Sequence, residues 1–382
     1  MPRTIYFDYN ATTPLDPAVR EAMLPFLGEI WGNPSSVHHI GRRARVLLDE
    51  ARERAAKVLG CKPGEIIFTS GGTESNNLAI FGTARRLKAK GRHLITSAIE
   101  HHAVLRCFDY LERKEGFEVT RLPVNSEGRV SVDDLKKAIR PDTILVSIMA
   151  ANNEIGTLQP VSELGTACRD GGVVFHTDAV QWFGKKPFDT VAQFNADLVS
   201  VCAHKFHGPK GAGLLFVKSP LQPDPVAFGG SHENERRAGT ESLAGIVGLI
   251  EAMERFLCPP VFKHEHLKPL TQRLITFVLK IDGASFVGPS EERLPNTASF
   301  VIRGADSISL LGNLDIEGIC ASSGSACSAG SLEPSHTIAA LGRQDSTGAF
   351  IRFSLGRGST KEEVNSVCHI LPEIIRRSQL GQ

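Results

Sequence analysis

Residues 143–178 have the sequence TILVSIMAANNEIGTLQPVSELGTACRDGGVVFHTD, which contains two apolar runs separated by a segment of helical periodicity. The runs, Thr143–Met149 and Val173–Asp178, lack strict alternation, as is typical of strands covered on both faces. The helical segment is Val161–Asp170, and Pro160 before it favours a helix start. The stretch therefore predicts a β–α–β unit, which implies parallel strands with helices packed against the sheet.

The same alternation extends in both directions from this unit. The sequence predicts further strands and helices in the first two thirds, with Gly60 as the stop of the first helix. After about residue 255 the order of elements changes, and Pro259-Pro260 marks a boundary. Beyond it, runs of strands and helices indicate a smaller α+β domain. The predicted strands are Glu65–Ser70, Arg92–Ser97, Ala196–Cys202, Ala212–Lys218, Asn296–Ile302 and Phe350–Leu355, and the predicted helices are Arg43–Leu59, Asp133–Arg140, Lys263–Lys280 and Thr360–Arg377.

Composition excludes several classes of protein. The chain has 382 residues, 41% of them hydrophobic and 22% charged, as expected of globular domains. Its 43 basic and 42 acidic residues give a net charge of +1, which argues against a dedicated nucleic-acid binder. No apolar run reaches the ~18 residues of a membrane span, and the first ten residues do not resemble a signal peptide. None of the eight cysteines forms a CxxC pair, which disfavours a disulfide scaffold or a zinc ribbon. We expect a soluble, cytoplasmic protein without a resident metal.

The segment Ser200–Gly213, SVCAHKFHGPKGAG, contains the first chemical signal. Lys205 follows a buried-type strand and precedes a Gly-Pro-Lys-Gly loop. An HK dipeptide alone would indicate a solvated turn lysine. With the glycine-rich loop beside it, an amine held where it can lose a proton is the better interpretation, and such lysines form Schiff bases.

Two weaker signals accompany this lysine. Thr69–Asn77, TSGGTESNN, follows a predicted strand and opens a helix, where free backbone N–H groups favour a phosphate. An ordinary N-cap by Thr73 would look similar, and the segment matches no nucleotide-binding pattern. Asp178 ends a predicted strand, where it could pair with a pyridinium nitrogen or simply cap a helix. Together, the lysine, the phosphate loop and the carboxylate predict a pyridoxal 5'-phosphate site.

Here the sequence resembles the NifS/IscS-type cysteine desulfurases, within the class V aminotransferases of pyridoxal phosphate fold type I. The resemblance extends nearly from end to end. It implies an α/β large domain, residues 15–258, with a mainly parallel sheet of the seven-stranded type, and a small α+β domain formed by residues 1–14 and 259–382. The motifs that support it are FDYNATTP (7–14), GNPSS (32–36), TSGGTESNN (69–77), EHHAV (100–104), NNEIG (152–156), HTDAVQ (176–181), HKFHGPKG (204–211), RRAGTES (236–242), SSGSACSAGSLEPSH (322–336) and IRFSLGR (351–357).

The resemblance also implies roles for individual residues. Lys205 would carry the coenzyme, His101 would stack on its ring and serve as an acid or base, and Asp178 would bind its ring nitrogen. Cys202 departs from the family pattern, which has Ser or Thr there as a phosphate donor, and a thiol is a weak donor. The other implied contacts are Gln181 and Asn153 beside the O3' side and the substrate, Gly72, Thr73 and His204 at the phosphate, Thr240 at the phosphate of the partner subunit in a homodimer, Arg352 at the substrate carboxylate, and Asn33 beside Arg352.

Cys327 differs from the other cysteines because its neighbours are almost all Gly, Ser or Ala. Such a segment makes a poor core and a good loop, so this thiol is expected to be exposed and reactive. The resemblance makes it the nucleophile that takes sulfur from L-cysteine as a persulfide and releases L-alanine, on a loop at about residues 322–336. The sulfur would pass to an acceptor protein such as an iron–sulfur scaffold, with Cys327 considered as a transient iron–sulfur ligand.

Three other functions are alternatives to cysteine desulfuration. A selenocysteine lyase would use the same site, and relative turnover of the two amino acids separates it. An aminotransferase would have no use for Cys327. A non-catalytic protein that holds sulfur or metal on its 13 histidines and eight cysteines lacks support from any ligand spacing.

Overall fold

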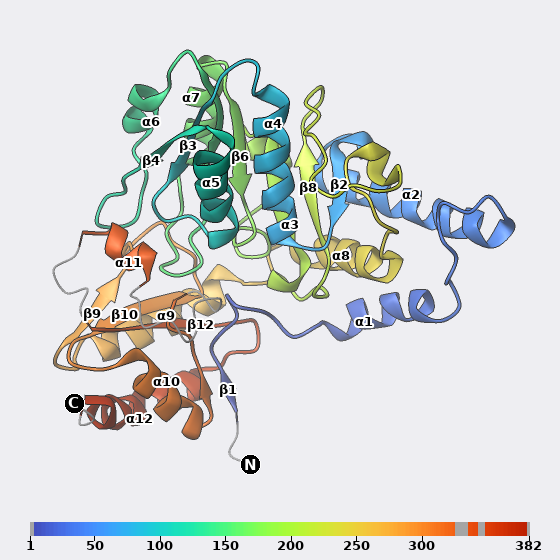
Figure 1. Ribbon diagram of the computed structural model, residues 1–382. Helices are drawn as coiled ribbons and strands as arrows, with labels where there is room; N and C mark the ends of the chain where they lie inside the picture. Colours follow the sequence, from blue (N-terminus) through green and yellow to red (C-terminus); the bar gives the residue numbers. More distant parts are fainter. Residues whose placement is uncertain (1–3, 325–334, 343–347, 380–382) are drawn as a thin grey trace.

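A seven-stranded sheet forms the centre of the computed structural model, which describes residues 4–324, 335–342 and 348–379 (Figure 1). Strand β8 runs antiparallel to both of its neighbours, whereas the other neighbouring strands are parallel. This confirms the predicted α/β fold with a mainly parallel sheet. In spatial order the strands are β2 (Ile66–Thr69), β8 (Gly213–Val217), β7 (Leu198–Cys202), β6 (Val174–Asp178), β5 (Thr143–Ser147), β3 (His93–Ser97) and β4 (Glu118–Leu122).

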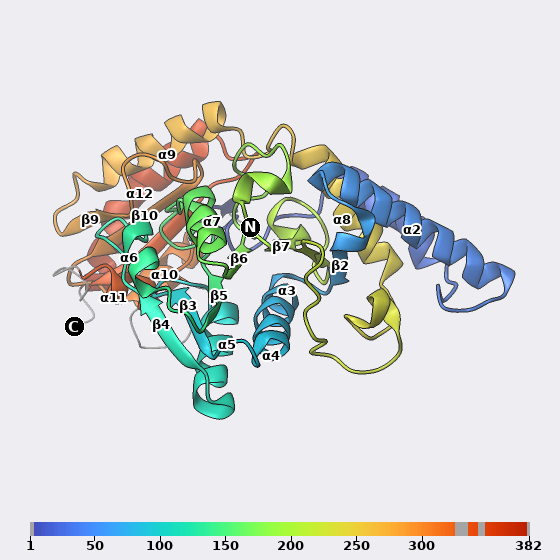
Figure 2. The same ribbon diagram turned by 90° about the horizontal axis from the view of Figure 1, so that it is seen from above.

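Helices cover both faces of this sheet, which is why its strands are apolar on both sides (Figure 2). Along β2, Ile66 and Phe68 join the core on one face and Ile67 joins the core on the other. The first face is covered by α1 (Pro17–Met23), α2 (His39–Leu59), α6 (Val132–Ala138), α7 (Val161–Asp170) and α8 (Leu243–Phe256), and the second by α3 (Gly72–Asn77), the π-helical turn η3 (Leu78–Gly82), α4 (Thr83–Leu87) and α5 (His102–Glu115).

Local chemistry explains where the structure departs from the predicted helix bounds. Helix α2 begins at His39 rather than Arg43 because the His38 ring accepts the Gly41 N–H at 3.2 Å and caps the helix. It ends as predicted, at a left-handed Gly60 with φ of 67°. Helix α6 ends at Ala138 rather than Arg140. The ring of Pro141 disfavours helical backbone angles at Arg140, the residue before it.

A second apolar core lies below the large sheet in Figure 1. It combines Ile5 and Phe7 with residues between Phe262 and Ile375, so the start of the chain packs with its last third. We retain the division into two domains near Pro259-Pro260 as a prediction that these separate cores support. This part contains the sheet β12 (Ala349–Ser354), β10 (Thr297–Ile302) and β9 (Ala284–Val287), the pair β1 (Ile5–Tyr6) and β11 (Ile319–Cys320), and helices α9 (His264–Val278), α10 (Ser307–Ile316), α11 (His336–Ala340) and α12 (Lys361–Gln379).

Short 3-10 turns connect several of these elements: η1 (Leu24–Leu27), η2 (Pro63–Glu65), η4 (Val191–Phe194), η5 (Ala203–Lys205) and η6 (His232–Glu235). None of the described helices is both long enough and apolar enough to cross a bilayer.

Candidate active site

The candidate site is a cavity at the carboxyl ends of neighbouring strands. Asp178 is the last residue of β6, and Lys205 ends the η5 turn directly after β7. Because β6 and β7 are parallel, these two side chains emerge at the same edge of the sheet. The cavity measures about 230 Å³ and is lined by Asn10, Ala11, Gly72, Thr73, Asn76, His101, Met149, Ala151, Asn153, Asp178, Val180, Gln181, Cys202, His204, Lys205 and Arg352.

The Lys205 amine is bound by backbone carbonyls. Its Nζ donates to the carbonyl oxygens of Asn10 at 2.9 Å and Ala11 at 2.7 Å. The pKa of this amine is lowered to about 8, mainly by burial and also by the guanidinium of Arg352, while Cys202, Asp8 and Asp178 oppose the shift. About a tenth of the Lys205 amine is therefore neutral, and nucleophilic, at pH 7.

Two neighbouring groups fix the Asp178 carboxylate. Asn76 Nδ2 donates to Asp178 Oδ2 at 2.6 Å, and the Val180 N–H donates to Oδ1 at 3.0 Å. The alternative prediction is that Asp178 caps a helix. In the structure a turn follows Asp178, and its carboxylate accepts a backbone N–H within that turn. Asn76 was not singled out from the sequence, although it belongs to the quoted TSGGTESNN segment.

His101 caps helix α5 and faces the cavity. Its Nδ1 accepts the Ala103 N–H at 3.1 Å, which leaves Nε2 as the protonated nitrogen of the neutral ring. Burial lowers the pKa of His101, while the charge of Asp178 opposes this shift. The ring is thus held neutral with a defined tautomer.

The turn between β2 and α3 forms a backbone cradle beside Cys202. Gly71, with φ of 148°, caps α3 in place of Thr73, and a side chain at Gly72 would come within 2.8 Å of Val180 Cγ2. The N–H groups of Gly72 and His204 point at the Cys202 sulfur, and burial raises the pKa of that thiol. His204 donates to or accepts from Thr12 Oγ1 at 3.0 Å, and burial lowers its pKa to about 3, so its ring is neutral.

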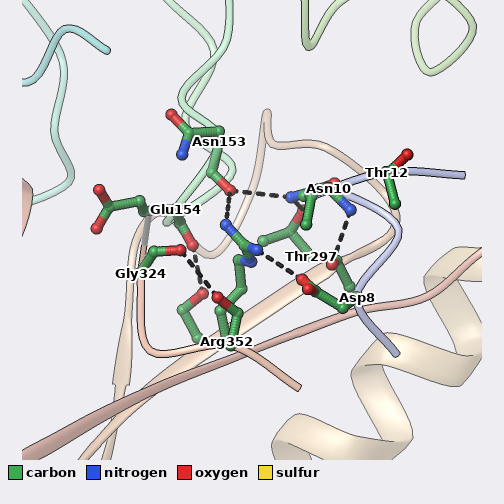
Figure 3. A network of polar contacts seen from close by, with 12 residues as sticks. Asp8, Asn10, Thr12, Asn153, Glu154, Thr297, Gly324 and Arg352 are labelled. Carbon is green, nitrogen blue, oxygen red and sulfur yellow. Dashed lines mark hydrogen bonds and ion pairs between the residues drawn. The ribbon is translucent and has the colours of Figure 1, made fainter. Parts of the chain in front are cut away.

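Arg352 lies on β12, in the part of the chain that forms the second core, and its guanidinium lines the cavity. This guanidinium is almost fully buried, pairs with Asp8 at 2.7 Å and donates to the Asn153 carbonyl at 3.0 Å (Figure 3). Its Nε has no hydrogen-bond partner among the described residues. That Nε is buried, whereas each terminal nitrogen uses one of its two N–H groups in these contacts, so the guanidinium at the cavity wall can still donate to a carboxylate.

The structure does not bring every predicted residue to this cavity. Asn33 and Thr240 are exposed and do not line it, and the Asn33 side chain accepts the Ser35 N–H at 2.8 Å. Cys327 lies outside the described residues. The described residues hold no cluster of His, Cys, Asp or Glu arranged to bind a metal.

Sequence reasoning missed the contribution of the N-terminal segment. Asn10 and Ala11 supply the carbonyls that hold Lys205, and Asn10 also donates to the Asn153 carbonyl at 3.0 Å and to Thr297 Oγ1 at 2.9 Å (Figure 3). Both residues belong to the quoted motif FDYNATTP, but nothing local to it indicates contact with a lysine almost 200 positions away.

The fold is that of the class-V aminotransferases, and the chain belongs to the aminotransferase class-V family, whose model matches residues 5–367. This family implies the use of pyridoxal 5'-phosphate. Relatives of the chain include cysteine desulfurases. The cysteine desulfurase IscS of Dictyoglomus turgidum is 50% identical over 379 residues, which cover 99% of this chain and 96% of that protein.

Solved structures agree with this assignment. A NifS-like protein superposes with a TM-score of 0.91 at 38% identity, covering 98% of this chain and all of that one. The structure of SspA in complex with cysteine matches with a TM-score of 0.79 at 35% identity, covering 94% of this chain and all of that one. The predicted family, fold type and enzyme class are therefore confirmed.

Proposed function

We propose that this chain binds pyridoxal 5'-phosphate through Lys205 and removes sulfur from L-cysteine, leaving L-alanine and a persulfide on Cys327. The main support is the pairing, in one cavity, of a partly neutral buried amine with a fixed carboxylate, at the ends of adjacent parallel strands. The family implies use of this coenzyme, and the cysteine-bound SspA supports the choice of substrate.

The residues in the cavity fit the coenzyme. Within the described part of the chain, no carboxylate is hydrogen-bonded to Lys205, so its amine is available to the aldehyde. Asp178, held by Asn76, presents a carboxylate for a protonated ring nitrogen. The cradle at Gly72, with His204 and Thr73 beside it, suits the phosphate, and the neutral His101 ring suits stacking.

The chain's own groups would then divide the work. Bound pyridoxal phosphate would withdraw electrons from the amino-acid carbons. Arg352 binds the substrate carboxylate through its guanidinium at the cavity wall, and Asn153 and Gln181 border the substrate. The Lys205 amine takes the proton from the substrate Cα and can return it to carbon.

Sulfur transfer would use the Cys327 thiolate as the nucleophile. It attacks the substrate sulfur, the substrate Cβ–S bond breaks with its electron pair left on Cβ, and a proton then completes the methyl group of alanine. The products, alanine and the Cys327 persulfide, together contain all atoms of cysteine and the thiol. An acceptor protein such as an iron–sulfur scaffold would then take the sulfur.

The proposed enzyme is a homodimer. Leu27, Trp31 and Val37, between α1 and α2, are 68%, 70% and 87% exposed, which is unusual for large apolar side chains on a free surface. Thr240 is exposed as well, in agreement with a role at the partner's phosphate. Light scattering should give twice the 41.4 kDa of one chain, and a single-chain mass would refute the dimer.

The central experiment mixes purified protein with pyridoxal phosphate, L-cysteine and a thiol reductant. We expect alanine and sulfide in equal amounts, and a borohydride-stable label on the peptide that contains Lys205. Pyridoxamine phosphate without sulfide would instead indicate transamination. If neither alanine nor a label on Lys205 were found, the proposal would be contradicted.

The low pKa of Lys205 predicts how coenzyme loading depends on pH. The neutral amine is the reactive form, so the rate of loading should rise with pH and level off above about 8 rather than above 10.5. Stopped-flow absorbance of coenzyme-free protein mixed with pyridoxal phosphate measures this rate. A lysine derivative in solution is the control, and a protein profile that follows it would contradict the assignment.

Cys202 predicts a gain of affinity on substitution. In Cys202→Ser a hydroxyl replaces a weakly donating thiol beside the phosphate cradle, and one neutral hydrogen bond contributes about 1 kcal/mol. The dissociation constant for pyridoxal phosphate should therefore fall about fivefold. Pyridoxal, which has no phosphate, is the matched control ligand and should bind both proteins equally. An equal gain for both ligands would place Cys202 away from the phosphate.

A further inference from the structure

Lys185 is a buried amine that the proposed reaction does not use. It lies seven residues after Asp178, in the turn that follows β6, and its side chain is only 1% exposed. The charged groups that act on it most are other cations, Lys205 and Arg352. Burial, reinforced by these cations, lowers the pKa of Lys185 well below its usual value.

Two side-chain amides and an aromatic ring surround this amine. Lys185 Nζ donates to Asn10 Oδ1 at 3.0 Å and makes a short hydrogen bond to Gln181 Oε1. The same nitrogen lies 5.3 Å from the centre of the Phe262 ring. Lys185 therefore donates hydrogen bonds to two residues that line the proposed coenzyme cavity.

These hydrogen bonds determine how the two amides are oriented. Since Lys185 donates to Gln181 Oε1, the NH2 end of Gln181 must point the other way, and it donates to the Asn10 carbonyl at 2.9 Å. That carbonyl also accepts from Lys205 Nζ. A single chain of contacts thus leads from Lys185 through Gln181 and Asn10 to the reactive amine.

Packing alone does not explain an amine at this position. Burying an amine costs free energy that an apolar side chain of the same length would not incur. Asn10 Oδ1 keeps a second donor, Asn296 Nδ2 at 3.0 Å, when Lys185 is removed. Gln181 Oε1 loses its donor and can regain one if the amide rotates. Methionine, with a similar length and no charge, should therefore fit here at little cost in stability once the Gln181 amide has turned.

We propose that Lys185 is a positioning residue, which fixes the orientation of the Gln181 amide and thereby the NH2 group that Gln181 directs to the Asn10 carbonyl and the coenzyme cavity beside Lys205. This inference rests on the proposed function and adds to it a residue that touches neither substrate nor coenzyme.

The first test compares Lys185→Met with Lys186→Met, a change at the adjacent, half-buried lysine. We expect Lys185→Met to raise the dissociation constant for pyridoxal phosphate about tenfold, as the loss of one well-placed hydrogen bond would, while the urea midpoint of the coenzyme-free protein stays close to that of wild type. Lys186→Met should change neither quantity. A lower urea midpoint with unchanged affinity would make Lys185 a purely structural residue, and unchanged affinity with unchanged stability would also overturn the proposal.

A double-mutant cycle shows whether Lys185 acts through Gln181. Lys185→Met should have a much smaller effect on coenzyme affinity when Gln181 is already alanine than in the wild-type background. Additive effects of the two substitutions would refute this route.

A last measurement separates this inference from the proposed function. Crystal structures of coenzyme-free wild type and Lys185→Met report the Gln181 and Asn10 side chains directly, whether or not the protein binds pyridoxal phosphate. We expect the Gln181 amide to be rotated or displaced in the variant, while Asn10, which Asn296 and Thr297 still hold, stays in place. An unmoved Gln181 amide would overturn the positioning role, whereas failure of the wild type to form a borohydride-stable link at Lys205 would refute the proposed function alone.

Discussion

Lys205→Ala should abolish the borohydride-stable link to pyridoxal phosphate and slow alanine formation from L-cysteine by at least about 10³-fold. The substitution removes the amine that binds the aldehyde and that moves the Cα proton. Mass spectrometry of the reduced protein measures the first effect, and alanine analysis measures the second.

The fold should survive this change. Both carbonyls lose the hydrogen bond from Lys205 Nζ. The Asn10 carbonyl still accepts a hydrogen bond from Gln181 Nε2, so the loss affects mainly the Ala11 carbonyl. Removal of a buried amine with a lowered pKa also relieves a desolvation cost. The urea midpoint of the coenzyme-free variant should therefore remain close to that of wild type.

Lys210→Ala is the matched control, since Lys210 is exposed in the same glycine-rich loop. It should retain both the covalent link and the rate of alanine formation. If Lys205→Ala kept either property, or if Lys210→Ala lost the link, the assignment of the coenzyme lysine would be wrong.

The central strands were predictable because helices cover both of their faces. Residues such as Ile66, Ile67 and Phe68 are apolar in sequence for that reason, and they pack alternately into the two cores. Strand β4 escaped prediction because it lies at the sheet edge, where Glu118–Leu122 is partly exposed and carries no apolar run. Edge strands are selected by their neighbours more than by their own composition.

The site was predictable only where a motif carries its own chemistry. Asp178 ends β6 and Lys205 follows β7 in a short turn, so both could be recognised locally, and parallel pairing of β6 and β7 then brings them together. Asn10, Asn76 and Lys185 could not be assigned in this way. Their importance comes from contacts across the fold, such as the bond from Asn76 to Asp178 over 102 positions, which no local pattern reports.

Cys327→Ala should stop sulfide release while leaving the coenzyme in place. The variant should bind pyridoxal phosphate on Lys205 with unchanged affinity and absorbance, yet its alanine and sulfide production should fall at least about 10³-fold, as expected when a nucleophile is removed. The separation arises because the proposed nucleophile takes part only after the substrate has bound.

The described residues on either side of the Cys327 segment lie next to the cavity. The Arg352 N–H donates to the Ser322 carbonyl at 2.7 Å, and Ser335 hydrogen-bonds the carboxylate of Glu154, the neighbour of Asn153. The described residues on both sides of the Cys327 segment therefore contact Arg352 and Glu154, beside the cavity.

Cys258→Ala is the control for this last prediction, because Cys258 is an exposed thiol that does not line the cavity. It should release sulfide at the wild-type rate. If Cys327→Ala still released sulfide and Cys258→Ala did not, the nucleophile would be a different cysteine. If both variants were active, neither Cys327 nor Cys258 would be the nucleophile, and the proposed role of Cys327 would be wrong.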